Sequence, residues 1–302
     1  MFYSWSKDKI CKRVLFLCCI VYLTGFSQAG RAWKDATGFE LKMQKPPQRI
    51  VSLVPSITEN LYELGAGEKV VGVTIYCNRP EDAKRKEKIG NMLEVNIEKI
   101  ISLKPDIVFA TVDDNRQQVV AKLRELGVVV FVFGREENFN TVCAHFQVLA
   151  EIVNARAKAR EILKDINMSM EKIVKKLRNL SPVKVFCQLG ANPVVTAAEG
   201  TSIDEFIQLA KGINIAHSLP GRYIRYSREQ VLKENPEVII ITSMGEDTER
   251  ERKNWSGFTQ LQAARNNRIY TVDADLVCRP APTVLIKGFE EIAKCIHPEA
   301  FK

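Results

Sequence analysis

One short unit occurs twice in this chain of 302 residues. Residues 95–111 read VNIEKIISLKPDIVFAT, and residues 226–242 read YSREQVLKENPEVIIIT. At one constant offset Glu98 matches Glu229, and the prolines behind the two helices coincide. Each copy has a helix-capping residue, apolar residues at helical spacing and a short apolar strand. The repeat therefore predicts two similar lobes.

Strands and helices alternate through both halves of the chain. The strands Ile107–Ala110, 128–133 (VVVFVF) and Val183–Gln188 are almost continuously apolar, which is typical of parallel strands covered on both faces. Residues 153–180 between the halves contain no glycine or proline and are rich in helix formers, so they predict a helix of about 40 Å. We expect an α/β fold with two Rossmann-like lobes, each built on a mainly parallel sheet, joined by one long rigid helix.

The predicted organisation has five segments, and the first is a signal peptide. A basic start, an apolar stretch too short to span a bilayer and small residues at Ser27 and Ala29 favour cleavage after Ala29 and a periplasmic protein. An uncleaved membrane anchor is the alternative. The segments are the signal peptide (1–29), a polar spacer (30–48), the N-terminal lobe (49–152), the bridging helix (153–181) and the C-terminal lobe (182–302).

Charge and cysteine content exclude several classes of protein. The net charge of +8 is spread along the chain, so nucleic acid is not an expected partner. Five cysteines follow the leader, none spaced as CxxC, and an odd number leaves at least one thiol free. With three histidines in the chain, a structural zinc site is not expected. The five cysteines are Cys77, Cys143, Cys187, Cys278 and Cys295.

The sequence lacks the common catalytic motifs, which makes an enzyme the weaker hypothesis. It contains no GxSxG, HExxH, phosphate-binding loop or dinucleotide fingerprint. Asp113, Asp114 and Asp275 are the only plausible sources of a titratable pair. We therefore expect no catalytic residues, no metal site and no cofactor.

Loops that follow the strands are the expected binding region, because ligands of two-lobed α/β proteins lie at the carboxyl ends of strands. Tyr76 and Tyr223 fall in such regions and could flank a flat ligand, or simply pack half-buried. Arg279 follows the last strand and could meet an amide, carboxylate or phosphate.

The repeated glutamates have two interpretations. Asn96 and Ser227 are good N-caps, which places Glu98 and Glu229 at the second helical position. A carboxylate there complements the helix dipole, worth roughly 0.3–1 kcal/mol. Alternatively, one like charge on each lobe forms a docking pair for a two-fold symmetric partner.

Several ordered motifs resemble one family. RIVSLVPSITENLYELGAGEKVVGVT, IEKIISLKPDIVFA, SREQVLKENPEVIIIT and DADLVCRPAP, with GFEEIAKCIHPE near the end, resemble the class III substrate-binding proteins of ABC importers for vitamin B12, iron-siderophores and haem. The resemblance covers about residues 49–298 and is closest to the cobalamin-binding branch. It implies a monomer that binds ligand between its lobes and delivers it to a permease dimer with its ATPase. The glutamates that meet permease arginines in this family match Glu98 and Glu229.

The resemblance also implies ligand contacts. In the cobalamin branch they come from a tyrosine that matches Tyr76 and from the stretch after the last strand, while Met92 and Tyr223 occupy positions of pocket tryptophans. A corrinoid is the expected ligand. The alternatives are haem, with Tyr76 or Tyr223 as iron ligand, and an anionic siderophore held by Arg79, Arg222, Arg225 and Arg279. The matching stretch after the last strand is Asp275, Leu276, Val277, Cys278 and Arg279.

Overall fold

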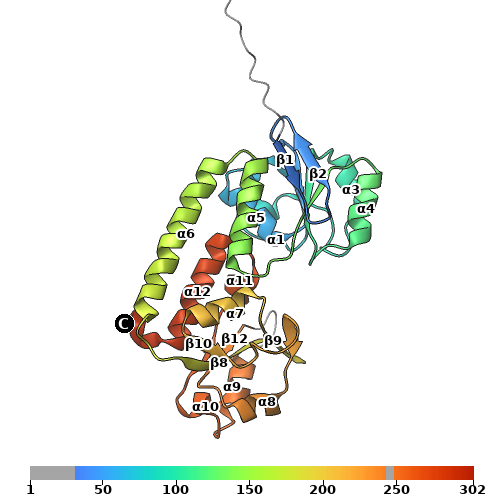
Figure 1. Ribbon diagram of the computed structural model, residues 1–302. Coiled ribbons are helices and arrows are strands. Elements are labelled where there is room, and N and C mark those ends of the chain that lie inside the picture. The colour runs from blue at the N-terminus through green and yellow to red at the C-terminus, as the bar shows by residue number, and fades with distance from the viewer. Residues whose placement is uncertain (1–30, 243–247) are drawn as a thin grey trace, which may run out of the picture.

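The computed structural model describes residues 31–242 and 248–302, and the expected signal peptide (1–29) lies outside this part of the chain. Figure 1 shows two α/β lobes, one above the other, with long helices along their shared side. This confirms the predicted fold class. In the described residues no helix is long and apolar enough to cross a membrane.

The N-terminal lobe is built on a five-stranded parallel sheet in the order β5–β4–β3–β6–β7. Its strands are β3 (Ile50–Ser52), β4 (Val70–Val73), β5 (Glu87–Lys88), β6 (Ile107–Thr111) and β7 (Val130–Phe133). Its helices are α1 (Pro55–Glu63), α2 (Glu81–Lys84), α3 (Ile97–Ser102), α4 (Gln117–Glu125) and α5 (Phe139–Ile152), with a 3₁₀ turn η1 (Gly67–Lys69).

The C-terminal lobe has a mixed six-stranded sheet. Its strands are β8 (Val183–Ala191), β9 (Val194–Ala197), β10 (Gly212–Asn214), β11 (Tyr223–Arg225), β12 (Val238–Ile241) and β13 (Ile269–Thr271). Its helices are α7 (Ser202–Leu209), α8 (Arg228–Glu234), α9 (Thr248–Ser256), α10 (Gln262–Arg265), α11 (Ala274–Cys278) and α12 (Pro282–Ile296), followed by the 3₁₀ turn η2 (Pro298–Phe301).

The repeat in the sequence corresponds to a repeat in strand order. The parallel run β4–β3–β6–β7 recurs as β10–β8–β12–β13. The repeated acidic residue has the same task in both lobes: Asp106 accepts a hydrogen bond from the Arg49 amide at 2.9 Å, and Glu237 accepts one from the Lys184 amide at 3.0 Å. Each carboxylate thus ties the start of the central strand, β3 or β8, to the start of its neighbour, β6 or β12. The antiparallel strands β9 and β11 extend the second sheet beyond this repeat.

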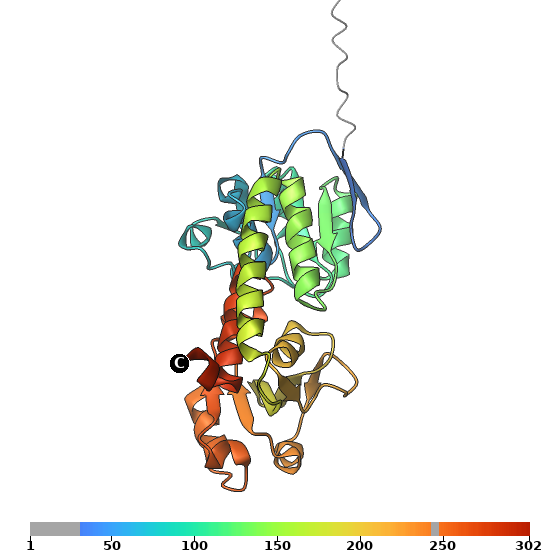
Figure 2. The ribbon, with the colours of Figure 1, turned by 60° about the vertical axis from the view of Figure 1, so that its left-hand side comes forward.

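Helix α6 (Arg156–Leu177) connects the lobes. Its 22 residues span about 33 Å, and its apolar face buries Leu163, Ile166 and Ile173. Helix α6 packs against α5 of the first lobe and α12 of the second, and both views show α12 running beside it (Figures 1 and 2). Since one apolar core continues through both lobes, the lobes are held together by packing as well as by the chain.

The segment expected to be a polar spacer (30–48) contains secondary structure. Strands β1 (Arg31–Lys34) and β2 (Glu40–Met43) form an antiparallel hairpin. Buried Asp35 fixes it to the N-terminal lobe by accepting the Val132 amide at 3.0 Å and pairing with Arg124 at 2.6 Å. The contacts that fix the hairpin reach about a hundred residues along the chain, so sequence patterning could not reveal them.

Asp35→Asn should therefore destabilise the protein at neutral pH. Burial alone would raise the pKa of Asp35, but hydrogen bonds from Thr37, Val132 and Phe39 outweigh it and lower the pKa. We expect a loss of about 2–3 kcal/mol in the free energy of unfolding at pH 7, measured by urea denaturation. Because its folded pKa is lowered, ionised Asp35 stabilises the protein at pH values above the unfolded pKa of about 4. The difference in the free energy of unfolding between variant and wild type should therefore shrink at lower pH. Glu40→Gln on the exposed hairpin face should change stability by less than about 0.5 kcal/mol; an equal loss in both variants would contradict this role.

Candidate ligand cleft

The cleft lies at the carboxyl ends of the parallel strands of the N-terminal lobe. Strand β4 leads into a loop whose Asn78 contacts Arg279 of the C-terminal lobe at 3.1 Å. Strand β6 leads into a loop whose Asp113 pairs with Arg222 of that lobe at 3.4 Å. Neighbouring parallel strands end at the same edge of a sheet, so both loops face the second lobe where ligands of open α/β sheets bind.

Between these contacts is a cavity of about 380 Å³ whose walls come from both lobes. The first lobe supplies acidic side chains from the loops after β6 and β7, and the second supplies the start of α7, β11 and the turn between α11 and α12. The lining residues are Asp113, Asp114, Glu136, Ser202, Ile203, Arg222, Tyr223, Val277, Cys278, Pro280 and Leu285.

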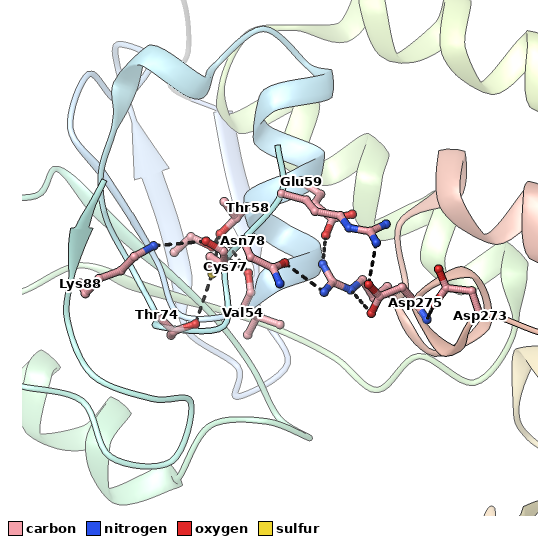
Figure 3. Close-up of polar contacts among 12 residues, drawn as sticks. Val54, Thr58, Glu59, Thr74, Cys77, Asn78, Lys88, Asp273 and Asp275 are labelled. Carbon is pink, nitrogen blue, oxygen red and sulfur yellow. Dashed lines mark hydrogen bonds and ion pairs between the residues drawn. The ribbon is translucent and has the colours of Figure 1, made fainter. Parts of the chain in front are cut away.

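One side of the cleft is spanned by what we call the Glu59 cluster, consisting of Glu59, Arg79, Asp275 and Arg279. Arg279 pairs with Glu59 of α1, and its Nε donates to Asp275 Oδ1 at 2.9 Å. Arg79 reaches the other carboxylate oxygen of Asp275 at 2.8 Å. Figure 3 shows Glu59 and Asp275 on opposite sides of the guanidinium groups, with Asn78 beside them. Two carboxylates and two guanidiniums make the cluster neutral.

Arg222 spans the cleft next to the cavity. Besides pairing with Asp113, it donates to the backbone carbonyl of Glu136 in the first lobe and, at 2.7 Å, to that of Gly200 in the second. The carboxylate of Glu205 on α7 accepts the amide at the start of α5, from Phe139, at 2.7 Å. Polar contacts thus join the lobes on more than one side of the cavity.

Three of the eight expected ligand-binding residues line the cavity: Tyr223, Val277 and Cys278. Tyr223 is 57% exposed, while Val277 is buried and also belongs to the core. Burial raises the pKa of the Cys278 thiol to about 11, so this thiol is uncharged at neutral pH.

The other five lie around the cavity. Tyr76 is 50% exposed in the loop after β4. Asp275 and Arg279 are held in the Glu59 cluster. Met92 is partly buried and its carbonyl accepts the Asn115 amide at 2.9 Å. Leu276 packs on the core beneath the cleft.

A glycine makes the placement of α11 possible. A Cβ at position 288 would lie 2.2 Å from the carbonyl oxygen of Leu276, so only glycine lets α12 approach the backbone of α11 this closely. This contact sets where the end of α11, which carries Val277 and Cys278, reaches the cleft.

Carboxylates outnumber arginines in the cavity wall: Asp113, Asp114 and Glu136 face Arg222. Burial raises the pKa of Asp114 against a hydrogen bond from Thr111, and it also raises the pKa of Glu136. The cavity is therefore acidic, and Asp114 and Glu136 are held in an environment that disfavours their charge.

The repeated glutamates lie on the outer surface of each lobe. Asn96 and Ser227 accept the expected capping hydrogen bonds, from Lys99 at 2.8 Å and Gln230 at 3.1 Å. Glu98 and Glu229 are both exposed at the second helical position, on α3 of the first lobe and α8 of the second (Figure 1). The helix start and Ser227 lower the pKa of Glu229, so this residue is charged at neutral pH.

The five cysteines in the described residues are free thiols. Burial raises the pKa values of Cys143 and Cys295 to about 12, and it raises that of Cys187 further. No group of three or more His, Cys, Asp or Glu suited to a metal ion occurs within residues 31–242 and 248–302.

Sequence reasoning missed three acidic residues of the cleft: Glu59, Glu136 and Glu205. Glu59 lies on α1, which follows the loop after strand β3. This position after a strand was the available sequence signal for a cleft residue. Glu136 follows strand β7 in the same way, whereas nothing local distinguishes Glu205 from other helix-start carboxylates.

Comparisons with known proteins agree on one family. The profile of the periplasmic binding protein family matches residues 50–276, so the chain belongs to this family. An uncharacterized ABC transporter substrate-binding lipoprotein, YvrC of Bacillus subtilis, is 33% identical over 274 residues, which cover 89% of this chain and 86% of the relative. These proteins are transport components rather than enzymes.

Solved structures of the family share the fold. The periplasmic vitamin B12 binding protein BtuF of Vibrio cholerae is 28% identical, with a TM-score of 0.73 over 85% of this chain and 99% of that protein. A periplasmic heme binding protein of Pseudomonas aeruginosa has a TM-score of 0.74 over 83% of this chain and 93% of its own, at 21% identity. The second likeness concerns the fold alone.

Asp114→Asn should stabilise the ligand-free protein. Because the folded pKa of Asp114 is raised, its negative charge destabilises the protein at pH values above the unfolded pKa of about 4. Asparagine can still accept the hydrogen bond from the Thr111 hydroxyl. We expect a Tm about 2 °C higher at pH 7, with the gain lost as the pH falls toward 4, in a thermal scan. Asp165→Asn on the exposed face of α6 is the matched control. A gain that persists at low pH would show that relief of charge is not its cause.

Proposed function

We propose that this protein is the substrate-binding component of an ABC importer and that it captures a corrinoid between its lobes. It acts outside the cytoplasmic membrane as a monomer and delivers its cargo to a permease dimer with its ATPase. The observation that carries this proposal is the state of the cleft arginines, which are already paired with carboxylates.

An anionic chelate needs free positive charge in its site, and the arginines suited to this are occupied. Arg279 and Arg79 belong to the neutral Glu59 cluster, and Arg222 pairs with Asp113. Arg225 is exposed on β11, outside the cavity wall. A ligand with carboxylates, such as haem or many siderophores, would have to break these ion pairs before binding.

The exposed side chains near the cleft suit a large neutral ligand. Ile75 and Tyr76 follow β4, Val112 follows β6, and Leu93 lies in the loop that Asn115 anchors; each is at least 41% exposed. Tyr223 stands in the opposite lobe. A corrin presents wide apolar faces and a rim of uncharged amides, which match apolar contacts and acidic hydrogen-bond acceptors.

The relatives support the same proposal. The Bacillus relative is described as an ABC transporter substrate-binding lipoprotein, and the Vibrio structure as a vitamin B12 binding protein. The assignment of a corrinoid ligand to this chain rests on these similarities together with the paired arginines.

Calorimetric titration with cyanocobalamin, cobinamide and haemin tests the ligand. We expect one-to-one, submicromolar binding of a corrinoid, weakened about tenfold by Tyr223→Ala or Tyr76→Ala through the loss of aromatic contact area. Tyr223→Phe and Tyr76→Phe keep the ring and should bind corrinoid normally.

Haemin binding tighter than corrinoid binding would contradict the proposed cargo. If a Tyr→Phe change then abolished the absorbance bands of bound haemin, that tyrosine would be an iron ligand. The transport role would stand with a different cargo.

The docking role of the glutamates is tested separately from the ligand. Glu98→Lys together with Glu229→Lys should leave the corrinoid dissociation constant within about twofold, because both residues lie outside the cleft. Uptake of labelled cyanocobalamin by cells that carry the permease should fall more than about tenfold, through like-charge repulsion with permease arginines.

The matched control places the same two charge reversals on the bridging helix, as Glu161→Lys and Glu171→Lys. Both residues are exposed on α6. If uptake persisted in the Glu98 and Glu229 double variant, or fell equally in the control, the two glutamates would serve only their helix starts.

A further inference from the structure

We propose that Glu59 determines ligand specificity by holding Arg279 away from the ligand, so that the cleft discriminates against anionic chelates. This inference rests on the proposed binding cleft and concerns the class of ligand that the cleft accepts. It assigns a role to a buried carboxylate on α1.

The position of Arg279 in the chain would otherwise place it in the cavity wall. Cys278 before it and Pro280 after it both line the cavity. The Arg279 side chain instead turns to the first lobe, where it pairs with Glu59 and contacts Asn78. Only 15% of this side chain is exposed. A guanidinium placed to reach ligand is thus engaged by an acid from the opposite lobe.

Glu59 is the most buried member of the cluster, with 8% of its side chain exposed. Since Glu59 and Asp275 together balance Arg79 and Arg279, the cluster presents no net charge to the cleft. Removing the charge of Glu59 would leave one positive charge in excess, at a place where burial weakens screening by solvent.

Stability alone does not account for a carboxylate at this position. Burial raises the pKa of Glu59 in opposition to Arg279, so the site disfavours the charge that it contains. Replacing both members of a buried ion pair by uncharged groups of similar size often costs little stability, and Arg279 would keep Asp275 as a partner if Glu59 alone lost its charge. A glutamine would fill the same volume and still accept a hydrogen bond from Arg279. What glutamine would lack is the ability to neutralise the arginine.

The test compares wild type with Glu59→Gln, using haemin as a chelate with two carboxylates and cyanocobalamin as a chelate with neutral amides. In Glu59→Gln we expect the affinity for haemin relative to cyanocobalamin to rise about tenfold. The haemin affinity of the variant should also depend more steeply on salt concentration than that of wild type, because a charge has been unmasked. Asp275→Asn removes the other acid of the cluster and should shift the ratio in the same direction.

Two controls tie the effect to Arg279. Glu63→Gln makes the same change in net charge on the exposed end of α1 and should leave the ratio unchanged. In the double variant with Glu59→Gln and Arg279→Gln the gain in haemin affinity should disappear.

The proposal is overturned if Glu59→Gln folds with a normal Tm and its haemin-to-cyanocobalamin ratio stays at the wild-type value, including the case in which neither protein binds haemin. An equal rise in Glu63→Gln would overturn it as well. A wrong cargo would give a different result, because wild type would then bind haemin more tightly than cyanocobalamin. The role of Glu59 would still be decided by comparing the haemin-to-cyanocobalamin affinity ratio of Glu59→Gln with that of wild type.

Discussion

The apolar contact between the two lobes is the constraint on which the rest of this structure depends. Phe139 of α5 meets Phe206 of α7 with ring centroids 5.7 Å apart, and Phe206 meets Phe289 of α12 at 5.2 Å. Helix α6 packs along the same side. Because an apolar interface between domains resists their relative motion, we expect the cleft opposite this contact to keep a nearly constant width. Ligand recognition must then come from the side chains that line it.

Several charged side chains of the cleft pair with partners in the opposite lobe. In the pairs Glu59–Arg279 and Asp113–Arg222 the first lobe contributes the carboxylate and the second the arginine, while Arg79 and Asp275 pair in the opposite sense. Pairing across the cleft stabilises the approach of the lobes and also removes free positive charge from the site. Exposed apolar residues such as Tyr76 and Tyr223 remain as the surface that we propose faces the ligand. In the proposed function, the contacts that hold the lobes together also restrict which ligands the cleft accepts.

The lobes and their capped helices were predictable because their signals are local. Apolar strands and capping residues such as Asn96 and Ser227 act within a few positions, and both capped as expected. The hairpin held by Asp35 and the pairing of Arg279 with Glu59 depend on residues far apart in the sequence. Spacing could identify Arg279 as a residue near the cleft, but only the folded chain shows that its charge is already satisfied.

A crystal structure of the protein with cyanocobalamin tests the central claim most directly. The account predicts a corrin between the lobes, with its faces near Tyr76 and Tyr223, its amides near the acidic wall and the Glu59–Arg279 pair intact. A ligand bound elsewhere, or one that draws Arg279 away from Glu59, would contradict the claim that the arginines are reserved for contacts between the lobes.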